Sequence, residues 1–392
     1  MATLKTKVLG IDFENPFILA SAPPTAKIES IDKAFTLGWG GAVFKTITPD
    51  NLEMIEASER YAVWKSGNKV CGFENIELLS HLTVQQWLDG IKYLRQKHPT
   101  KVQIASIMAP VVKEEWQKLV LTLNEAEIDA FELNFSCPHG MPEKGIGMAI
   151  GTDPEISSMI TKWVMSVAKK PVFVKLSPNV TNIVAIAKAV EEAGADGFAA
   201  INTVQSLMGV DLDTFEPSPR VNGQTTYGGY SGISVKPIGL RCVAQLRQNS
   251  KLPILGIGGI ASWRDAAEYI TVGADVVQVC TEVMVNGYGI ISAMKKGLLE
   301  YLENKGFNSP EDLKNKAIAN ITYHKELNKK KQAYPYIDDA LCLKCGKCAT
   351  ICDESEHSAL SISNGHLVVD KNACVGCSLC SHICPKQAIT MK

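Results

Sequence analysis

The amino-acid sequence predicts an α/β chain in which a closed parallel barrel is followed by a small cysteine-rich domain. Two observations support this prediction. Between residues 17 and 280, short apolar runs alternate with amphipathic segments of helical spacing, a pattern typical of a parallel sheet covered by helices. Eight of the twelve cysteines then lie between residues 342 and 384, which marks the end of the chain as a separate domain.

Each of the apolar runs is expected to form one barrel strand. In chain order they are residues 17–22, 42–47, 102–108, 130–135, 172–177, 197–202, 253–258 and 275–280. The intervening segments include VQQWLDGIKYLRQK and NIVAIAKAVEEAG, whose apolar residues recur at helical spacing. Eight such units match a (β/α)8 TIM barrel, with an open doubly wound sheet as the alternative.

Three parts of the chain are expected. They are a barrel domain at residues 1–305, a linker at 306–334 and the cysteine-rich domain at 335–392. The basic stretch NKKKQAYPYIDD, with its charges followed by a proline, is typical of a linker. At the other end, residues 1–16 are expected to form a hairpin that closes the bottom of the barrel.

Composition excludes several classes of function. The formal net charge of −1 gives no reason to expect nucleic acid or an anionic membrane as a partner. No apolar run is long enough to span a membrane, and the start MATLKTKVLGIDFENPF lacks the apolar core of a signal peptide. We therefore expect a cytoplasmic protein, in which clustered cysteines indicate metal ligands rather than disulfides.

The clustered cysteines form two motifs of spacing C-x2-C-x2-C-x3-C, the run of bacterial-type ferredoxins that hold two [4Fe–4S] clusters. Three closely spaced thiolates hold one cluster, and the fourth crosses to the other. The predicted ligands of the first cluster are Cys342, Cys345, Cys348 and Cys384. Those of the second are Cys352, Cys374, Cys377 and Cys380. Zinc knuckles are the alternative, but they do not explain why the C-x2-C-x2-C spacing of three cysteines occurs twice.

The two motifs differ in one respect that bears on electron transfer. Asp353 follows the first motif, whereas Pro385 follows the second, and a three-residue insertion accompanies the change. The number of thiolates is unaffected. Because charge and solvent exposure tune cluster potentials, the potential of the nearby cluster does not follow from the motif alone.

Polar residues gather where the predicted strands end. The C-terminal ends of barrel strands meet on one face, which is where catalytic groups lie in this fold. A single lysine or asparagine there is usually a solvated or turn residue. Six strands that end in groups able to bind a polar ring or a phosphate nevertheless indicate a binding site. The residues are Lys45, Thr46, Asn134, Ser136, Cys137, Lys175, Asn202, Thr203, Gly258, Gly259, Cys280 and Thr281.

The stretch GIGGIASWRDAAEY indicates where the phosphate binds. Gly258 and Gly259 allow close approach of the backbone, and a helix from about Ser262 would direct its positive end at the anion. Iron–sulfur clusters pass single electrons, whereas most organic substrates take a pair, so the barrel is expected to hold FMN. Lys175 would then lie near the N1/O2 edge of the flavin. The sequence contains no G-x-G-x-x-G motif between a predicted strand and a predicted helix, so we do not expect a nicotinamide-binding domain.

The segment LNFSCPHG leaves the role of Cys137 open. On its residues alone the thiol can be a core residue, a metal ligand, a nucleophile or a proton donor, and a structural thiol is the commonest case. No cluster of other ligand-type residues accompanies it, which disfavours the metal site.

Several segments resemble the dihydropyrimidine dehydrogenase family, in its FMN and C-terminal iron–sulfur part. They are ASAPPT, FKTIT, NIELLS, ELNFSCPHGMPEKGIGMAIG, VKLSPNVT, INTV and TTYGGYSG, and the likeness spans nearly the whole chain. Dihydroorotate dehydrogenases are related to that family and share its barrel and flavin. The chain looks like the pyrimidine-reducing subunit of the two-subunit bacterial enzyme. The resemblance thus implies a partner subunit that carries FAD, further clusters and the NAD(H) site.

The resemblance also implies roles for individual residues. FMN would be held by Ser21, Lys45, Thr46, Lys175, Gly232, Gly258, Gly259, Cys280 and Thr281. The pyrimidine would be held by Asn75, Glu77, Asn134, Ser136, Asn202 and Thr203. Cys137 would be the acid that protonates C5 of uracil while the flavin delivers a hydride to C6, and residues 136–151 would form a lid.

The expected function is therefore the reduction of uracil and thymine, with electrons from NADH arriving through the partner. Two alternatives remain. One is a dihydroorotate-type dehydrogenase with its own ferredoxin tail. Glu77 disfavours this alternative, because a carboxylate beside the substrate would repel that of orotate. The other is an electron carrier whose barrel is only a scaffold.

Overall fold

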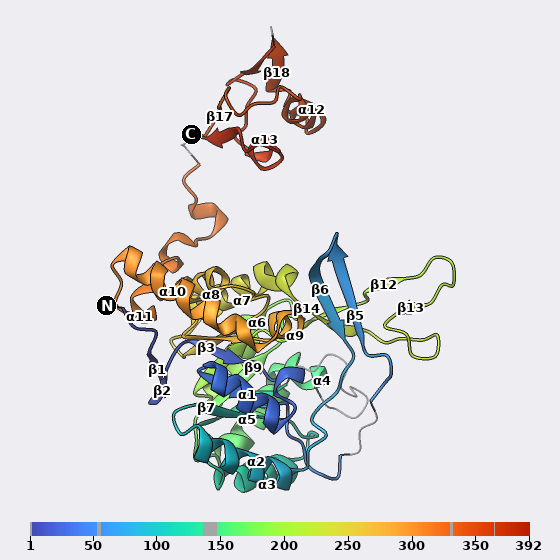
Figure 1. The fold of residues 1–392 in the computed structure, drawn as a ribbon, viewed down its shortest axis with the longest axis vertical. Helices are drawn as coiled ribbons and strands as arrows, with labels where there is room; N and C mark the ends of the chain where they lie inside the picture. Colours follow the sequence, from blue (N-terminus) through green and yellow to red (C-terminus); the bar gives the residue numbers. More distant parts are fainter. Residues whose placement is uncertain (1, 53–55, 136–146, 330–331, 364) are drawn as a thin grey trace. The chain divides into compact units, whose positions relative to one another are not determined.

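The computed structural model describes residues 2–52, 56–135, 147–329, 332–363 and 365–392. The chain divides into two compact units, Met1–Asn320 and Ile321–Lys392, each of which is described by itself. Figure 1 shows the barrel unit and the smaller unit along the colour gradient of the chain.

A closed parallel barrel forms the centre of the first unit. Its strands are β3 (Phe17–Leu19), β4 (Gly41–Val43), β7 (Val102–Ile107), β8 (Ala130–Asn134), β9 (Val172–Leu176), β10 (Gly197–Ala200), β15 (Ile254–Ile257) and β16 (Val276–Val279). The order around the barrel is β10-β15-β16-β3-β4-β7-β8-β9, which follows the chain. The predicted TIM barrel and its strands are confirmed, and the open sheet is excluded. All eight strands end before the predicted limit, because the last residues of each apolar run belong to the loops.

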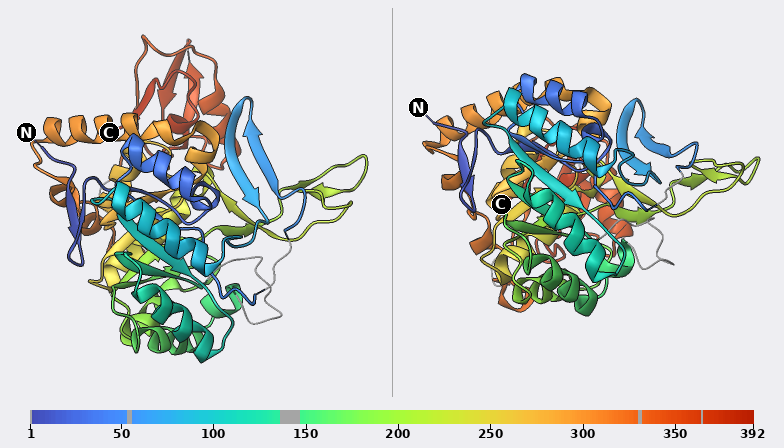
Figure 2. Two further views of the ribbon diagram at one scale, coloured as in Figure 1. Left: turned by 60° about the horizontal axis from the view of Figure 1, so that its bottom comes forward. Right: turned by 90° about the horizontal axis from the view of Figure 1, so that it is seen from below.

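Helices surround these strands (Figure 2). The main ones are α1 (Ile28–Leu37), α2 (Val84–Lys97), α3 (Lys113–Asn124), α5 (Pro154–Met165), α6 (Ile183–Glu192), α7 (Lys236–Asn249), α8 (Trp263–Thr271) and α10 (Ile291–Lys305). Side chains at the N-caps Thr83, Asp153, Asn182 and Ser262 accept hydrogen bonds from backbone N–H groups of the first turn. The helix predicted from about Ser262 is thus α8.

The first residues close one end of the barrel. Strands β1 (Thr6–Val8) and β2 (Ile11–Phe13) pair as an antiparallel hairpin. Val8 and Phe13 are buried in one cluster with Val102, Ala130 and Phe173, which lie at the starts of their strands. The predicted hairpin therefore covers the N-terminal end of the barrel, opposite the strand ends that carry the polar residues.

A second sheet lies beside the other end and was not predicted. Its order is β11 (Val204–Ser206), β14 (Gly228–Ser231), β6 (Lys69–Asn75) and β5 (Tyr61–Ser66). The hairpin β5–β6 projects from the barrel in Figure 1, as does the arm formed by β12 (Gly209–Val210) and β13 (Pro217–Ser218). These insertions follow β4 and β10, so the long connections of the barrel build a wall beside the site.

Residues 306–320 belong to the first unit. They include α11 (Pro310–Leu313), whose Leu313 is buried in the barrel core, and Lys314, whose Nζ lies 2.7 Å from Asp275. This segment falls within the predicted linker 306–334. Its packing is that of an extension of the barrel domain.

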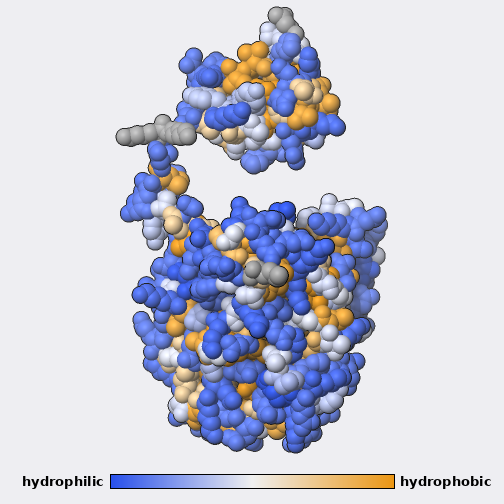
Figure 3. All heavy atoms as spheres, turned by 60° about the vertical axis from the view of Figure 1, so that its left-hand side comes forward, coloured by the Kyte–Doolittle hydropathy of each residue, from blue (hydrophilic) through white to orange (hydrophobic). Residues whose placement is uncertain are grey.

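The second unit is built from short elements. They are β17 (Pro335–Ile337), paired with β20 (Ile389–Met391), β18 (Leu360–Ser363), paired with β19 (His366–Val369), and the helices α12 (Lys347–Glu354) and α13 (Leu379–His382). Its buried cluster consists of Leu360, Cys380 and Ile389. In the view of Figure 3, hydrophobic residues gather on the visible face of this unit. The visible face of the barrel unit is mainly hydrophilic. So small a core suggests that bound clusters stabilise the fold of this unit.

Among the described residues, no helix has both the length and the apolar character needed to cross a bilayer.

Candidate active site and cluster-binding sites

A cavity of about 580 Å³ lies at the carboxyl ends of the barrel strands, within the size range of cofactor sites. It brings together every described residue of the predicted flavin and substrate sites. They are Ser21, Lys45, Thr46, Asn75, Glu77, Asn134, Lys175, Asn202, Thr203, Gly232, Gly258, Gly259, Cys280 and Thr281. The predicted Ser136 and Cys137 lie outside the described residues. The individual roles stay predictions, but the residues share one site.

Hydrogen bonds join the strand ends across the mouth of the barrel. Thr46 Oγ1 accepts from Asn134 Nδ2 at 2.9 Å and lies 3.3 Å from Ser21 Oγ. Asn134 Oδ1 in turn accepts from Asn202 Nδ2 at 3.3 Å, and the Asn202 side chain accepts from Thr203 N at 2.8 Å. This series of hydrogen bonds orients the amides, because each amide group has a defined donor or acceptor partner. The site can therefore present amides of fixed polarity to a ring.

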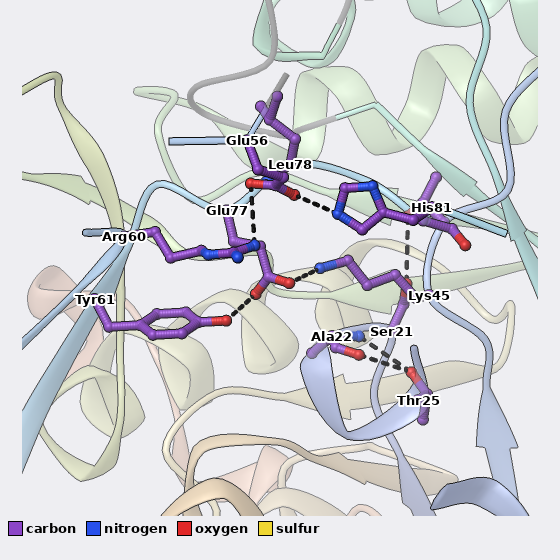
Figure 4. A network of polar contacts seen from close by, with 12 residues as sticks. Ser21, Ala22, Thr25, Lys45, Glu56, Arg60, Tyr61, Glu77, Leu78 and His81 are labelled. Atoms are coloured by element: carbon purple, nitrogen blue, oxygen red, sulfur yellow. Dashed lines mark hydrogen bonds and ion pairs between the residues drawn. The ribbon is translucent and has the colours of Figure 1, made fainter. Parts of the chain in front are cut away.

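Lys45 and Glu77 form an ion pair in the cavity wall (Figure 4). Lys45 follows β4 and is buried, and Glu77 follows β6 with a side chain that is 10% exposed. Tyr61, the first residue of β5, donates from its hydroxyl to the other carboxylate oxygen of Glu77. Burial and this hydrogen bond raise the pKa of Tyr61 well above its ordinary value, so the phenol keeps its proton. Sequence reasoning missed Tyr61 because the β5–β6 hairpin was not predicted.

Beside this group lies a second polar cluster (Figure 4). Glu56 accepts from the backbone N–H of Leu78 at 3.1 Å, and Arg60 and His81 each lie 3.5 Å from its carboxylate. These contacts fasten the segment that carries Glu77 to the segment before β5.

Lys175 is backed by a carboxylate inside the barrel. Its Nζ lies 3.5 Å from Oε1 of Glu132 in the neighbouring strand β8, and Glu132 is completely buried. Gln278 Nε2 donates to the other oxygen of Glu132 at 2.7 Å. Sequence reasoning missed both Glu132 and Gln278. The available signal was a polar residue in the middle of each of two otherwise apolar strands.

The loop between β15 and α8 forms a cradle for an anion. Gly258 and Gly259 have φ values of +126° and +68°, in the region that favours glycine. A Cβ on Gly259 would lie 2.7 Å from Lys236 N and 2.8 Å from Gly232 O, so a side chain would fill the cradle. Ser231, which precedes Gly232 in the chain and also lines the cavity, has its Oγ 2.9 Å from Thr281 Oγ1. Open backbone, hydroxyls and a helix N-terminus fit a phosphate group.

Asp265 supports this loop from the first turn of α8. Its carboxylate accepts from Ala261 N at 3.1 Å and from Ser262 Oγ at 2.7 Å, and Lys236 Nζ lies 2.7 Å away. Burial raises the pKa of Asp265, but the hydrogen bonds from Lys236 and Ser262 outweigh it and hold the pKa below its ordinary value. A carboxylate near the cradle is thus balanced by Lys236.

Cys280 lines the cavity as a protonated thiol. Burial raises its pKa to about 11. Its Sγ lies 3.8 Å from Met284 Sδ in the following helix α9 (Thr281–Asn286). Such a thiol does not act as a nucleophile at neutral pH.

In the second unit, the cysteines surround two small cavities. The first cavity is lined by Cys342, Cys345, Cys348 and Cys384. The second is lined by Cys352, Cys374, Cys377 and Cys380. Each cavity is thus bordered by three cysteines of one motif and the last cysteine of the other. This is the grouping that the sequence predicts for two cubane clusters.

Comparison with known proteins gives two family matches. Residues 3–302 match the family described as dihydroorotate dehydrogenase, and residues 335–391 match the 4Fe-4S dicluster domain. The second match confirms iron–sulfur clusters over zinc.

Individual relatives cover most of the chain. It is 38% identical to the NAD-dependent dihydropyrimidine dehydrogenase subunit PreA of Escherichia coli K12, over 97% of this chain and 93% of the relative. It is 35% identical to the chloroplastic dihydropyrimidine dehydrogenase (NADP(+)) of Arabidopsis thaliana, over 84% and 80%. It is 37% identical to the catalytic subunit of dihydroorotate dehydrogenase B (NAD(+)) of Pyrococcus horikoshii, over 79% and 96%. These matches confirm the resemblance inferred from the sequence.

Proposed function

This chain belongs to the dihydroorotate dehydrogenase family, and we propose that within this family it is the catalytic subunit of an NAD-dependent dihydropyrimidine dehydrogenase. The reaction is the reversible reduction of the C5=C6 bond of uracil and thymine to 5,6-dihydropyrimidines. The electrons come from NADH through a partner subunit that holds FAD and iron–sulfur clusters. The relative from Escherichia coli, which covers nearly the whole chain, is itself described as a subunit, which supports a partner.

The observation that carries the proposal is the lining of the barrel cavity. Three asparagine side chains, Asn75, Asn134 and Asn202, share it with the carboxylate of Glu77. Amides offer both a donor and an acceptor, which matches the alternating N–H and C=O groups of a pyrimidine edge. Glu77 adds a strong acceptor for an N–H and disfavours a substrate that carries its own carboxylate.

The cofactors follow from the family and from the cradle. The family binds FMN, and the dicluster domain carries the iron–sulfur clusters. The backbone of Gly258 and Gly259 would hold the phosphate, and Lys175 would face the flavin ring. When bound, FMN supplies the hydride that C6 receives and exchanges single electrons with the clusters.

The residues of this chain orient the substrate and supply the proton. Asn134 and Asn202, already oriented by their mutual hydrogen bond, would hold the pyrimidine ring. Glu77 would accept from a ring N–H while Lys45 balances its charge. Cys137 would donate the proton that C5 receives, because C5 gains a hydrogen as C6 does. Loss of this proton leaves a thiolate, which must be protonated again before the next turnover.

An anaerobic half-reaction tests the proposal. The purified chain with its cofactors is reduced chemically, uracil or orotate is added separately, and the oxidised flavin absorbance is followed. We expect reoxidation by uracil alone. Reoxidation by orotate alone would assign the chain to the dihydroorotate-type reaction, the second candidate, which the relative from Pyrococcus horikoshii favours. If neither uracil nor orotate reoxidised the flavin, both proposed reductase activities would be contradicted and an electron carrier would be favoured.

A further inference from the structure

Tyr61 lies between two of the predicted substrate residues. It is the first residue of β5, and in the antiparallel ladder its partner on β6 is Asn75. Its ring packs against that of Phe73, with centroids 5.4 Å apart, and Phe73 lines the cavity. The contact with Phe73 thus holds the tyrosine ring beside a residue of the cavity wall, independently of its hydroxyl.

The hydroxyl has a separate task. It donates to Oε2 of Glu77, while Lys45 Nζ contacts Oε1, so each carboxylate oxygen is held from a different side (Figure 4). These two contacts, on different oxygens, fix the plane of the carboxylate. Each carboxylate oxygen can accept more than one hydrogen bond, so neither contact prevents Glu77 from accepting an N–H group of a ligand. Without the hydroxyl, the carboxylate would be free to turn toward Lys45 as a bidentate partner.

We propose that Tyr61 is a positioning residue for substrate binding, whose hydroxyl holds the carboxylate of Glu77 in the orientation that accepts an N–H of the pyrimidine. This inference rests on the proposed function, because it presupposes a neutral ring with an N–H as the ligand. It assigns to Tyr61 an effect on substrate affinity and none on FMN retention.

Calorimetric titration of the full chain, with FMN and clusters bound, tests this role without turnover. Uracil is titrated into the wild type and into Tyr61→Phe, which keeps the ring on Phe73 and removes only the hydroxyl. We expect affinity to fall about tenfold, the size of losing one hydrogen bond to a charged group, at unchanged FMN content. The matched control is Tyr227→Phe. Tyr227 is 63% exposed and, unlike Tyr61, has no described hydrogen bond to Glu77, so uracil affinity should be unchanged.

A double-mutant cycle separates positioning from a merely structural effect. If Tyr61 acts through Glu77, Tyr61→Phe should weaken uracil binding in the wild type and have no further effect in Glu77→Gln. An equal loss in both backgrounds would mean that the hydroxyl stabilises the hairpin instead, and wild-type affinity in Tyr61→Phe would overturn the role outright. If the wild type itself neither binds uracil nor is reoxidised by it, the proposed function fails first and this inference falls with it.

Discussion

The ammonium group of Lys175 lies 3.5 Å from the carboxylate of Glu132, and both side chains are buried inside the barrel. Gln278 donates to the second oxygen of Glu132 at 2.7 Å and so fixes the carboxylate. Lys175 also lines the cavity, whereas Glu132 lies behind it. The positive charge expected beside the flavin is therefore partly balanced by a negative charge that solvent cannot screen.

This pair predicts that Glu132→Gln raises the reduction potential of the bound flavin. Removing the negative charge leaves Lys175 unbalanced, and a stronger positive field favours the reduced flavin, which carries more negative charge. We expect a positive shift of roughly 30 mV, a tenfold change in a two-electron equilibrium constant, in a spectroelectrochemical titration. Glu74→Gln is the control, because Glu74 is equally buried but its carboxylate contacts Ser206 at 2.9 Å instead of Lys175. Its replacement should leave the flavin potential unchanged. An unchanged or more negative potential in Glu132→Gln would contradict the assignment.

The glycine cradle predicts that Gly259→Ala loses FMN. The added Cβ would lie 2.7 Å from Lys236 N and 2.8 Å from Gly232 O, so the loop must move and the space for the phosphate closes. The purified variant should contain little flavin and keep its iron. Gly10→Ala is the control, because Gly10 has a similar φ of +83° but no atom within 4 Å of the added Cβ. It should lose about 1–2 kcal/mol of stability and retain FMN. Equal flavin content in both variants would place the phosphate elsewhere.

The charge of Glu77 predicts a change of substrate preference in Glu77→Gly. The wild-type carboxylate accepts from a ring N–H and repels the carboxylate of orotate. Without it, Lys45 is free to attract that carboxylate. We expect reoxidation of the reduced chain by uracil to slow and that by orotate to rise from its wild-type level. An unchanged ratio of the two rates would remove Glu77 as the discriminating residue.

The sequence was sufficient for the barrel because its strands are buried on both faces and read as continuous apolar runs. The polar strand ends could be predicted for the same reason, since each one interrupts such a run. Glu132 was not predicted as a site residue, because one acidic residue inside AFELN gives the segment the alternating apolar and polar pattern of a half-exposed strand. Tyr61 could not be found, since its place depends on the pairing of β5 with β6. Pairing in an insertion is decided by tertiary contacts rather than by local pattern.

The two cysteine-lined cavities predict how ligand variants fall into groups. Cys384→Ser should remove the same cluster signal as Cys345→Ser, because both residues border the first cavity. Cys352→Ser should instead match Cys377→Ser at the second cavity. Electron paramagnetic resonance of the reduced protein, together with iron content, distinguishes the groups. If each motif held its own cluster, Cys384→Ser would match Cys377→Ser, and the crossed assignment would be wrong.

The proposed proton donor predicts a specific defect in Cys137→Ala. Cys137 lies outside the described residues, so the prediction rests on the chemistry of the reaction and on the family resemblance. Hydride transfer to C6 places negative charge on the ring that only a proton at C5 removes, and a positioned acid contributes about 10²–10⁴-fold to such a step. The reduced variant should therefore be reoxidised by uracil slower by roughly that factor. Its uracil affinity, flavin and iron should be unchanged. Cys71→Ala is the control, because Cys71 lies in β6 and its thiol contacts only a backbone oxygen, that of Lys69 at 3.6 Å, among the hydrogen bonds of the described residues. Loss of flavin and iron in Cys137→Ala would show a structural thiol, and a wild-type rate would mean that another group delivers the proton.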